Sequence, residues 1–338
     1  MEIIYNYSLK RLNTFAVDAI AKAFVEVKGD EELLEILSNN ELKNYRKFIL
    51  GGGSNVLFTK NFDGLVIKNS VPGIEIINAD ENMVTMESGA GVIWNDLVTF
   101  CVNRNFGGIE NLALIPGTVG AAPVQNIGAY GEELSETFIS LDGIYIDSSE
   151  KVVFNKDDCR FGYRNSIFKN ELKNKFIITK VRLRLNKNPK SKTNYGNVMD
   201  ELEKTGKTKF TIKDISEVIS KIRREKLPDP AIIGNAGSFF KNPEIEPDHY
   251  DLLRKQFPDL KGFPADGGRI KLSAAWLIDK AGWKGFRKGN TGTYINHALV
   301  IVNYGNAIGE EILHFAKEIK KSVYEKYNII LEEEVNII

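Results

Sequence analysis

The organisation of this 338-residue chain is clearest in the stretch Phe48-Ile49-Leu50-Gly51-Gly52-Gly53-Ser54-Asn55-Val56-Leu57-Phe58. Apolar runs flank a group of small residues, which predicts a strand, a glycine turn and a second strand. No Gly-Lys-Ser/Thr follows, as in an ATP-binding P-loop, and no helix opens on the glycines, as in a Rossmann dinucleotide site. The N–H groups of such a turn can nevertheless surround a pyrophosphate. A plain hairpin turn and a phosphate-binding loop both fit this stretch.

Around this turn, short apolar runs bounded by turn residues predict a strand-rich chain with a few helices. We expect strands at 24–27, 48–50, 56–58, 65–67, 74–77, 83–86, 143–146, 152–154, 176–185 and 329–338. We expect helices at 30–37, 93–102, 211–226, 272–280 and 309–327. A capping box at Thr211–Asp214 opens the third helix, and Pro228 and Pro230 prevent its continuation. The pattern is that of an α+β protein with more than one domain.

The composition is that of an ordinary intracellular globular protein. Lys+Arg and Asp+Glu both number 45, so no net charge attracts nucleic acid or an anionic membrane. Cys101 and Cys159 form neither a disulfide framework nor a metal site, which favours a reducing cytoplasm. We find no signal peptide and no apolar run of membrane-spanning length. We therefore expect a cytoplasmic monomer that binds neither nucleic acid nor membrane and holds no metal.

A second glycine-rich stretch strengthens the interpretation of the first as a ligand-binding loop. Residues 110–131 run almost without charge through Pro116-Gly117-Thr118-Val119-Gly120 to Gly128-Ala129-Tyr130-Gly131. The stretch has too many glycines and prolines for a helix, and its backbone amides could follow an elongated ligand. Two such loops beside a strand-rich region suggest a large dinucleotide held without a Rossmann fold.

The stretch Gly234-Asn235-Ala236-Gly237-Ser238-Phe239-Phe240-Lys241-Asn242-Pro243 places one hydroxyl among small residues. Glycines let the backbone approach a ligand closely, Ser238 can donate a proton, and Lys241 and Asn242 can meet an anion or a carbonyl. A surface turn that carries a buried Phe pair is the alternative interpretation.

Two charged residues elsewhere are candidates for the same site. Arg164 follows an aromatic residue, and its planar guanidinium suits a carboxylate or an enolate, although a surface arginine fits equally well. Near the end of the chain, Glu332 and Glu334 would share one face of a strand, with Leu331 and Val335 on the other. A solvated acidic run is the alternative there.

Taken in order, these motifs resemble the UDP-N-acetylenolpyruvoylglucosamine reductase (UDP-N-acetylmuramate dehydrogenase) family of peptidoglycan precursor synthesis. The resemblance extends from Asn13 to Val335, and the segment around Tyr195 is similar to the longer class, which carries a tyrosine loop. It implies an FAD-binding PCMH-type (vanillyl-alcohol-oxidase-like) two-subdomain flavin fold plus a C-terminal α/β substrate domain. The flavin domain would span 16–187, with subdomains at about 1–65 and 66–210 and strand 329–338 returning to the flavin site. The substrate domain would span 211–328.

The resemblance also implies non-covalent FAD and NADPH as the reductant. No histidine lies in the glycine-rich loops, so no covalent flavin link is expected there. The residues implied to bind FAD are Gly51, Gly52, Gly53, Ser54, Asn55, Pro116, Gly117, Thr118, Gly120, Ala121, Asn126, Gly128, Ala129 and Tyr130.

By resemblance, NADPH reduces FAD and leaves, and the enolpyruvyl ether of UDP-N-acetylglucosamine then accepts hydride from flavin N5. Negative charge develops as an enolate, which Arg164 and Glu334 would flank and to which Ser238 would give the final proton. Glu334 must carry a proton to stabilise an anion, so we expect a buried carboxyl whose pKa is raised.

The residues implied to bind the substrate are Tyr163, Tyr195, Lys226, Asn242 and Lys271. Phe263 departs from the family pattern, because the long class tends to have a tyrosine there that closes over the substrate. Glu333 stands where the family usually has proline. Two alternatives stay open, namely an FAD-dependent oxidase of a sugar or hydroxy acid and a non-catalytic nucleotide-binding paralogue.

Overall fold

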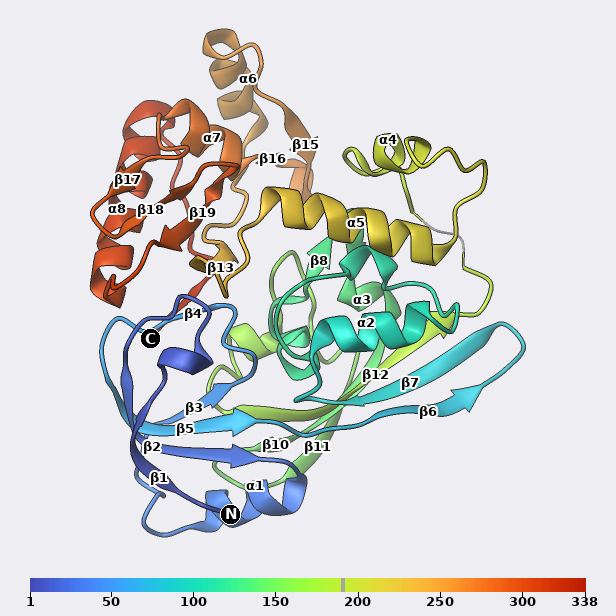
Figure 1. Ribbon diagram of the computed structural model, residues 1–338, viewed down its shortest axis with the longest axis vertical. Helices are drawn as coiled ribbons and strands as arrows, with labels where there is room; N and C mark the ends of the chain where they lie inside the picture. Colours follow the sequence, from blue (N-terminus) through green and yellow to red (C-terminus); the bar gives the residue numbers. More distant parts are fainter. Residues whose placement is uncertain (190–191) are drawn as a thin grey trace. The chain divides into compact units, whose positions relative to one another are not determined.

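The computed structural model describes residues 1–189 and 192–338, which form two compact units. The first unit consists of Met1–Tyr7, Ala21–Gly53 and Phe62–Arg223. The second consists of Ser8–Ile20, Ser54–Asn61 and Arg224–Ile338. Both units mix helices and strands (Figure 1), which confirms the expected α+β class. In the part of the chain that is described, no helix is long and apolar enough to cross a membrane.

A four-stranded sheet near the N-terminus begins the first unit. Its order is β1 (Ile4–Ser8), β2 (Ile20–Val27), β5 (Phe62–Asn69) and β3 (Lys47–Leu50), with β2 and β3 parallel to β5. The predicted helix α1 (Asp30–Ser38) is confirmed, and its buried face packs with β2 and β5 in one apolar cluster. This arrangement directs the end of β3 into the glycine turn.

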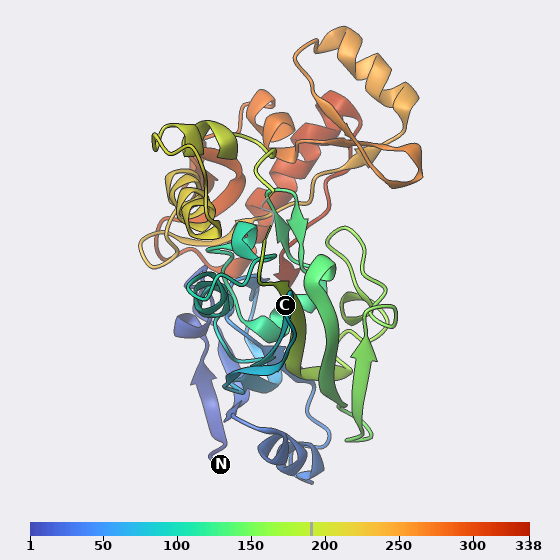
Figure 2. The ribbon, with the colours of Figure 1, turned by 90° about the vertical axis from the view of Figure 1, so that its right-hand side faces the viewer.

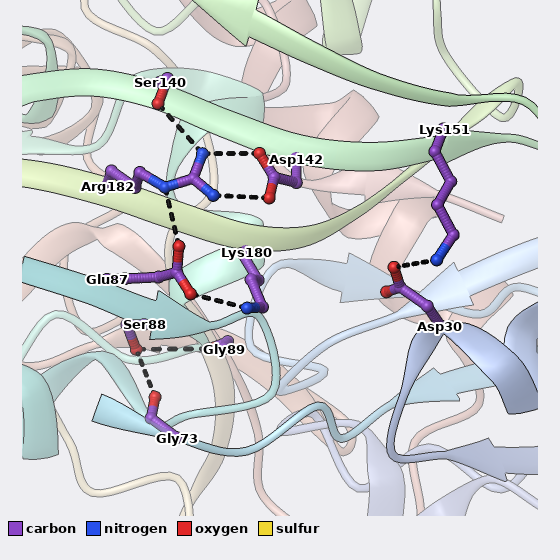
Figure 3. Close-up of polar contacts among 10 residues, drawn as sticks. All are labelled: Asp30, Gly73, Glu87, Ser88, Gly89, Ser140, Asp142, Lys151, Lys180 and Arg182. Carbon is purple, nitrogen blue, oxygen red and sulfur yellow. Dashed lines mark hydrogen bonds and ion pairs between the residues drawn. The ribbon is translucent and has the colours of Figure 1, made fainter. Parts of the chain in front are cut away.

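A five-stranded antiparallel sheet follows in the order β11 (Lys151–Asn155), β10 (Phe138–Tyr145), β12 (Phe176–Asn186), β7 (Met83–Gly89) and β6 (Ile74–Ala79). Along β12, Val181, Leu183 and Leu185 enter the largest core, while the intervening basic residues face the other way. Arg182 donates to both carboxylate oxygens of Asp142 on β10, at 2.6 Å each, and to Glu87 on β7 at 2.7 Å (Figure 3). Its planar fork thus joins three neighbouring strands and fixes their register.

Three helices of the first unit pack against this sheet in one apolar cluster. The core contains residues of α2 (Trp94–Val102), α4 (Val198–Glu203) and α5 (Ile212–Lys226). The predicted apolar stripe of α5 is buried here through Ile215, Ile219 and Ile222. The sequence places this helix at the start of the C-terminal domain, whereas the units divide at Arg223 and Arg224. The difference arises because the buried stripe of α5 belongs to the core of the first unit.

The second unit is built on an antiparallel sheet of order β13 (Gly234–Ser238), β19 (His297–Asn303), β18 (Thr291–Tyr294) and β17 (Arg287–Lys288). The predicted helices α7 (Ala274–Lys280) and α8 (Gly309–Tyr327) are confirmed, and their apolar stripes pack on this sheet. Helix α6 (Pro247–Gln256) and the small sheet β14 (Glu244–Ile245), β16 (Ile270–Leu272) and β15 (Gly262–Pro264) project from the part formed by α7 and α8 (Figure 2). The sequence analysis did not predict α6 or this small sheet.

Two early segments of the chain complete the second unit. Phe15 and Leu57 are buried in its core, and the Asn303 side chain donates to the Phe15 carbonyl at 2.9 Å. Strand β4 (Val56–Leu57) pairs in parallel with β20 (Asn336–Ile337). The strand expected over 329–338 is therefore mostly absent, because upstream of β20 a single bridge from Glu333 to Phe240 is formed.

Candidate active site

The glycine turn and the second glycine-rich stretch touch each other in the first unit. A Cβ atom at Gly52 would lie 2.8 Å from the Cα of Gly117, and one at Gly51 would lie 2.6 Å from the Thr118 hydroxyl. At Gly52 the neighbour is backbone, so a side chain would push the two loops apart, whereas at Gly51 the Thr118 side chain would have to move. The half-buried Lys68 donates from Nζ to the Gly51 carbonyl, which fixes the orientation of the turn. The two loops are therefore in close contact, and backbone amides of glycine-rich loops are groups that can surround a pyrophosphate.

The second loop is also held by the segment that directly follows β7, residues 90–92. Val119 N–H donates to the Val92 carbonyl at 2.8 Å, and Gly120 N–H donates to the Ala90 carbonyl at 2.9 Å. A Cβ at Gly120 would meet the Ala90 side chain at 2.5 Å. The position of Pro116 to Ala121 is thus set by the sheet rather than by the loop's own side chains.

Three non-glycine residues of the predicted site have left-handed backbone, namely Asn126, Tyr130 and Arg164, with φ of 43°, 50° and 51°. This conformation is unfavourable for L-residues and tends to occur where function constrains the chain. Asn126 donates to Glu133 at 2.7 Å and to the Gly162 carbonyl at 3.2 Å. Its side chain therefore joins β8 (Gly128–Ala129) and β9 (Glu132–Glu133) to the segment that carries Arg164.

Arg164 is half-buried beside β8. Its guanidinium donates to the Gly128 carbonyl and lies 5.4 Å from the centre of the Tyr163 ring. A Cβ at Gly128 would lie 3.0 Å from an Arg164 nitrogen, so the small residue makes room for the guanidinium. The structure thus brings Tyr163, Arg164 and Gly128 together.

A second arginine that the sequence analysis missed lies near this group. Arg223, on α5, donates from Nε to the Leu114 carbonyl at 3.3 Å. Burial lowers its pKa, nearby Tyr130 raises it, and the like charge of Arg164 lowers it further. Its position four residues after Ile219 places it beside the buried stripe, and this spacing is the signal that could have identified it.

Glu132 on β9 is 7% exposed, and burial raises its pKa to about 7, with Glu136 and Glu110 acting in the same direction and Lys192 opposing them. The folded chain therefore retains a proton that the unfolded chain releases near pH 4.5. The free energy of unfolding should consequently fall as pH rises through this window.

Glu132→Gln carries no titrating group at this position, so its free energy of unfolding should not fall in this way. The free energy of unfolding of the variant should therefore rise relative to that of the unsubstituted protein between pH 5 and pH 8. Urea unfolding across that range measures it, with the exposed Glu150→Gln as the control. Parallel pH profiles for the unsubstituted protein and Glu132→Gln would contradict the assignment.

In the second unit, Ser238 lies at a β-bulge of β13. Asn235 pairs with Val302 and Ser238 with Val300, so one extra residue is accommodated between them. Gly237 takes up the bend with a φ of 69°, and its N–H donates to the Asn235 side chain at 2.9 Å. The next two residues, Phe239 and Phe240, are buried. The bulge thus orients the half-buried Ser238 independently of the regular strand.

The segment that carries Glu334 runs beside the continuation of β13. Glu334 N–H donates to the Phe239 carbonyl at 2.8 Å, and the Asn55 side chain donates to the Glu334 carbonyl at 3.2 Å. The neighbouring Glu332 and Glu333 form ion pairs with Lys241 and Lys320, at 3.1 and 2.7 Å. Glu334 is half-buried, less than expected, because Leu331 and Val335 fill the core from the opposite face of the segment.

The remaining residues predicted to bind substrate also have defined neighbours. Lys226 is exposed at the end of α5, near the half-buried His297, whose pKa is lowered by desolvation and then by the positive charge of Lys226. Asn242 accepts from the Ala274 N–H at 3.0 Å and so fixes the start of α7. Lys271 is 3.2 Å from Glu244. Phe263, on β15, is 56% exposed.

Comparison with known proteins decides the family. Residues 21–147 match the FAD binding domain model, and residues 229–338 match the C-terminal domain model of UDP-N-acetylenolpyruvoylglucosamine reductase. The reductase of Flavobacterium johnsoniae is 50% identical, and that of Amoebophilus asiaticus 47% identical, each over the full length of both chains. This chain belongs to the UDP-N-acetylenolpyruvoylglucosamine reductase family. The family member of Pseudomonas aeruginosa is 43% identical over 100% of this chain and 99% of its own.

The fold agrees with that of a solved family member. The crystal structure of the reductase from Thermus caldophilus superposes with a TM-score of 0.66 at 24% identity and covers 99% of this chain and 98% of that one. The flavin fold of the PCMH type with an added C-terminal domain is confirmed. The chain is an FAD-dependent oxidoreductase that reduces a small molecule, the enolpyruvyl ether of UDP-N-acetylglucosamine, with NADPH as reductant.

Proposed function

We propose that three residues carry the proton and charge chemistry of this reduction, with Arg164 and Glu334 stabilising the enolate and Ser238 protonating it. FAD, when bound, supplies the hydride that it has received from NADPH. The observation that carries the proposal is the bulge at Ser238, which orients one hydroxyl beside the segment that holds Glu334. A weak acid suffices as the proton donor because a carbanion-like centre is a strong base.

The part assigned to Arg164 follows from charge and shape. Its guanidinium can donate two parallel hydrogen bonds to the substrate carboxylate, and its hydrogen bond to the Gly128 carbonyl fixes its position. The positive charge of nearby Arg223 adds to the field at Tyr130 and Arg164. A fixed positive field of this kind stabilises negative charge as it forms in the transition state.

Glu334 must act in its protonated form, since a carboxylate would repel an enolate. We propose that it donates a hydrogen bond to the substrate carboxyl group as charge develops there. Half-burial of Glu334, beside the buried Leu331 and Val335, favours the protonated form of its carboxyl group. The expected raised pKa of Glu334 is part of this proposal.

We propose that the two glycine-rich loops hold the FAD pyrophosphate through backbone N–H groups, with the expected cofactor residues of 51–55 and 116–130 around the flavin. We assign the substrate diphosphate to Lys226, Asn242, Lys271, Tyr163 and Tyr195. Cations and hydroxyls are the donors that a diphosphate requires. Lys271 is partly neutralised by Glu244, so we expect it to contribute less than Lys226.

We further propose a cytoplasmic monomer that binds no nucleic acid. The support is the balance of 45 basic against 45 acidic residues and the two buried thiols, whose pKa values burial raises to about 12. Thiols of this kind are unreactive.

An anaerobic absorbance experiment tests the proposed function. The protein with bound FAD should lose its yellow colour with NADPH and regain it with the enolpyruvyl sugar nucleotide. Recovery of colour with oxygen only would favour the oxidase alternative. A protein that takes up no FAD would contradict the proposal altogether.

A further inference from the structure

Lys192 holds the start of the tyrosine loop, here residues 192–197, against the β8–β9 hairpin of the same unit. Its ammonium group contacts the Glu136 carboxylate and lies 3.6 Å from Glu132 Oε1. Glu136 also accepts from the Glu133 N–H at 3.1 Å and so caps the short helix α3 (Leu134–Thr137). One carboxylate therefore serves both the helix start and the lysine.

The backbone of Lys192 is bound as well. The buried Asn111 donates from its amide nitrogen to the Lys192 carbonyl and to the Tyr130 carbonyl, at 2.9 Å each. Tyr130 and Lys192 are thus joined through one amide group, although they are far apart in the sequence. Both the side chain and the main chain of Lys192 are therefore bound to residues in or next to the β8–β9 hairpin, which includes Tyr130.

Tyr195 lies directly over this hairpin. Its ring meets the Tyr130 ring edge to face, with centroids 6.4 Å apart, and a Cβ at Gly131 would contact it at 3.5 Å. Tyr195 is 60% exposed, which leaves it accessible to a ligand. Downstream, Val198 and Leu202 of α4 are buried in the core. The loop is anchored on both sides of Tyr195.

We propose that Lys192, held by Glu132 and Glu136, is a positioning residue for Tyr195. This inference rests on the proposed role of Tyr195 at the substrate diphosphate. An unanchored loop would populate other arrangements, and apparent affinity falls in proportion to the competent fraction. We call the contacts of the Lys192 ammonium group with Glu132 and Glu136 the clamp. Because exposed ion pairs are individually weak, loss of the clamp should raise KM by only about fivefold.

Lys192→Met and Glu136→Gln test the inference in the full-length holoenzyme. Lys192→Met should raise KM for the enolpyruvyl sugar nucleotide about fivefold, and Glu136→Gln about twofold because Glu132 remains, with the rate of flavin reduction by NADPH unchanged in both. Amide hydrogen exchange in residues 193–197 should accelerate in both variants. The control is Lys204→Met, which removes the exposed ion pair of Lys204 with Glu201 on α4 and should change neither value.

The Glu136→Gln variant separates positioning from direct binding. If Lys192 bound the diphosphate itself, removal of its carboxylate partner would lower KM, which would overturn the inference. In a Tyr195→Phe background, Lys192→Met should have no further effect on KM, and a persistent effect would also overturn it. If Tyr195→Phe itself left KM unchanged, the proposed role of Tyr195 would fail, while the exchange rates would still report on the clamp.

Discussion

Ser238→Ala should leave the reduction of bound flavin by NADPH intact and slow its reoxidation by the enolpyruvyl substrate. The expected factor is about 10²- to 10⁴-fold, the typical contribution of general acid catalysis. The difference between the half-reactions arises because NADPH oxidation requires no proton from the hydroxyl. Anaerobic stopped-flow absorbance of the flavin measures both rates separately.

The exposed Ser148→Ala is a matched control and should change neither rate. The bulge geometry should survive in Ser238→Ala, because it depends on Gly237 and on the Asn235 side chain. Circular dichroism checks that the variant is folded. Equal impairment of both half-reactions would show that Ser238 is structural.

Gly52→Ala should weaken FAD binding by about 5- to 150-fold, which corresponds to the typical cost of about 1–3 kcal/mol for overpacking. The added methyl group would lie 2.8 Å from the Cα of Gly117, so backbone meets backbone and the two loops must separate. The flavin would lose N–H donors from at least one loop. Titration of apoprotein with FAD, followed by flavin fluorescence, gives the dissociation constant.

Gly29→Ala is the control for a glycine-to-alanine change in the same unit. Gly29 precedes α1 with extended backbone, and a Cβ there has nothing within 4 Å. FAD affinity should be unchanged in this variant. An unchanged affinity in Gly52→Ala as well would mean that the contact between the loops does not shape the flavin site.

The long helices could be predicted from the sequence because their signals are local. The apolar stripe of 309–327 predicts the first and last residues of α8 correctly. The capping box and the prolines predict the end of α5 correctly and its start within one residue. Helix α6 was missed because only Leu253 of its residues is buried, so it has no apolar stripe. Strand β19 was missed too, since a short continuous apolar run has no periodicity of its own.

The site could be predicted as motifs but not as contacts. Glycines, a hydroxyl and an arginine can be found by local composition, and Gly237 in particular indicates an unusual backbone. The partners of these motifs come from distant segments. No local pattern marks the hydrogen bonds that side chains donate to distant carbonyls, such as those from Lys68 to Gly51, Asn111 to Lys192 and Arg223 to Leu114. Such residues become visible only when the chain is folded.

The second unit is not continuous in sequence, and this has a consequence for how the chain folds as it is synthesised. Phe15 and Leu57 are made early, but the core that buries them includes Phe315 and Val335. Strand β4 likewise pairs with residues near position 336. Contacts over such separations form slowly, because a long loop must close first. On the ribosome, these apolar segments must therefore wait, exposed to chaperones and proteases, until almost the whole chain has emerged.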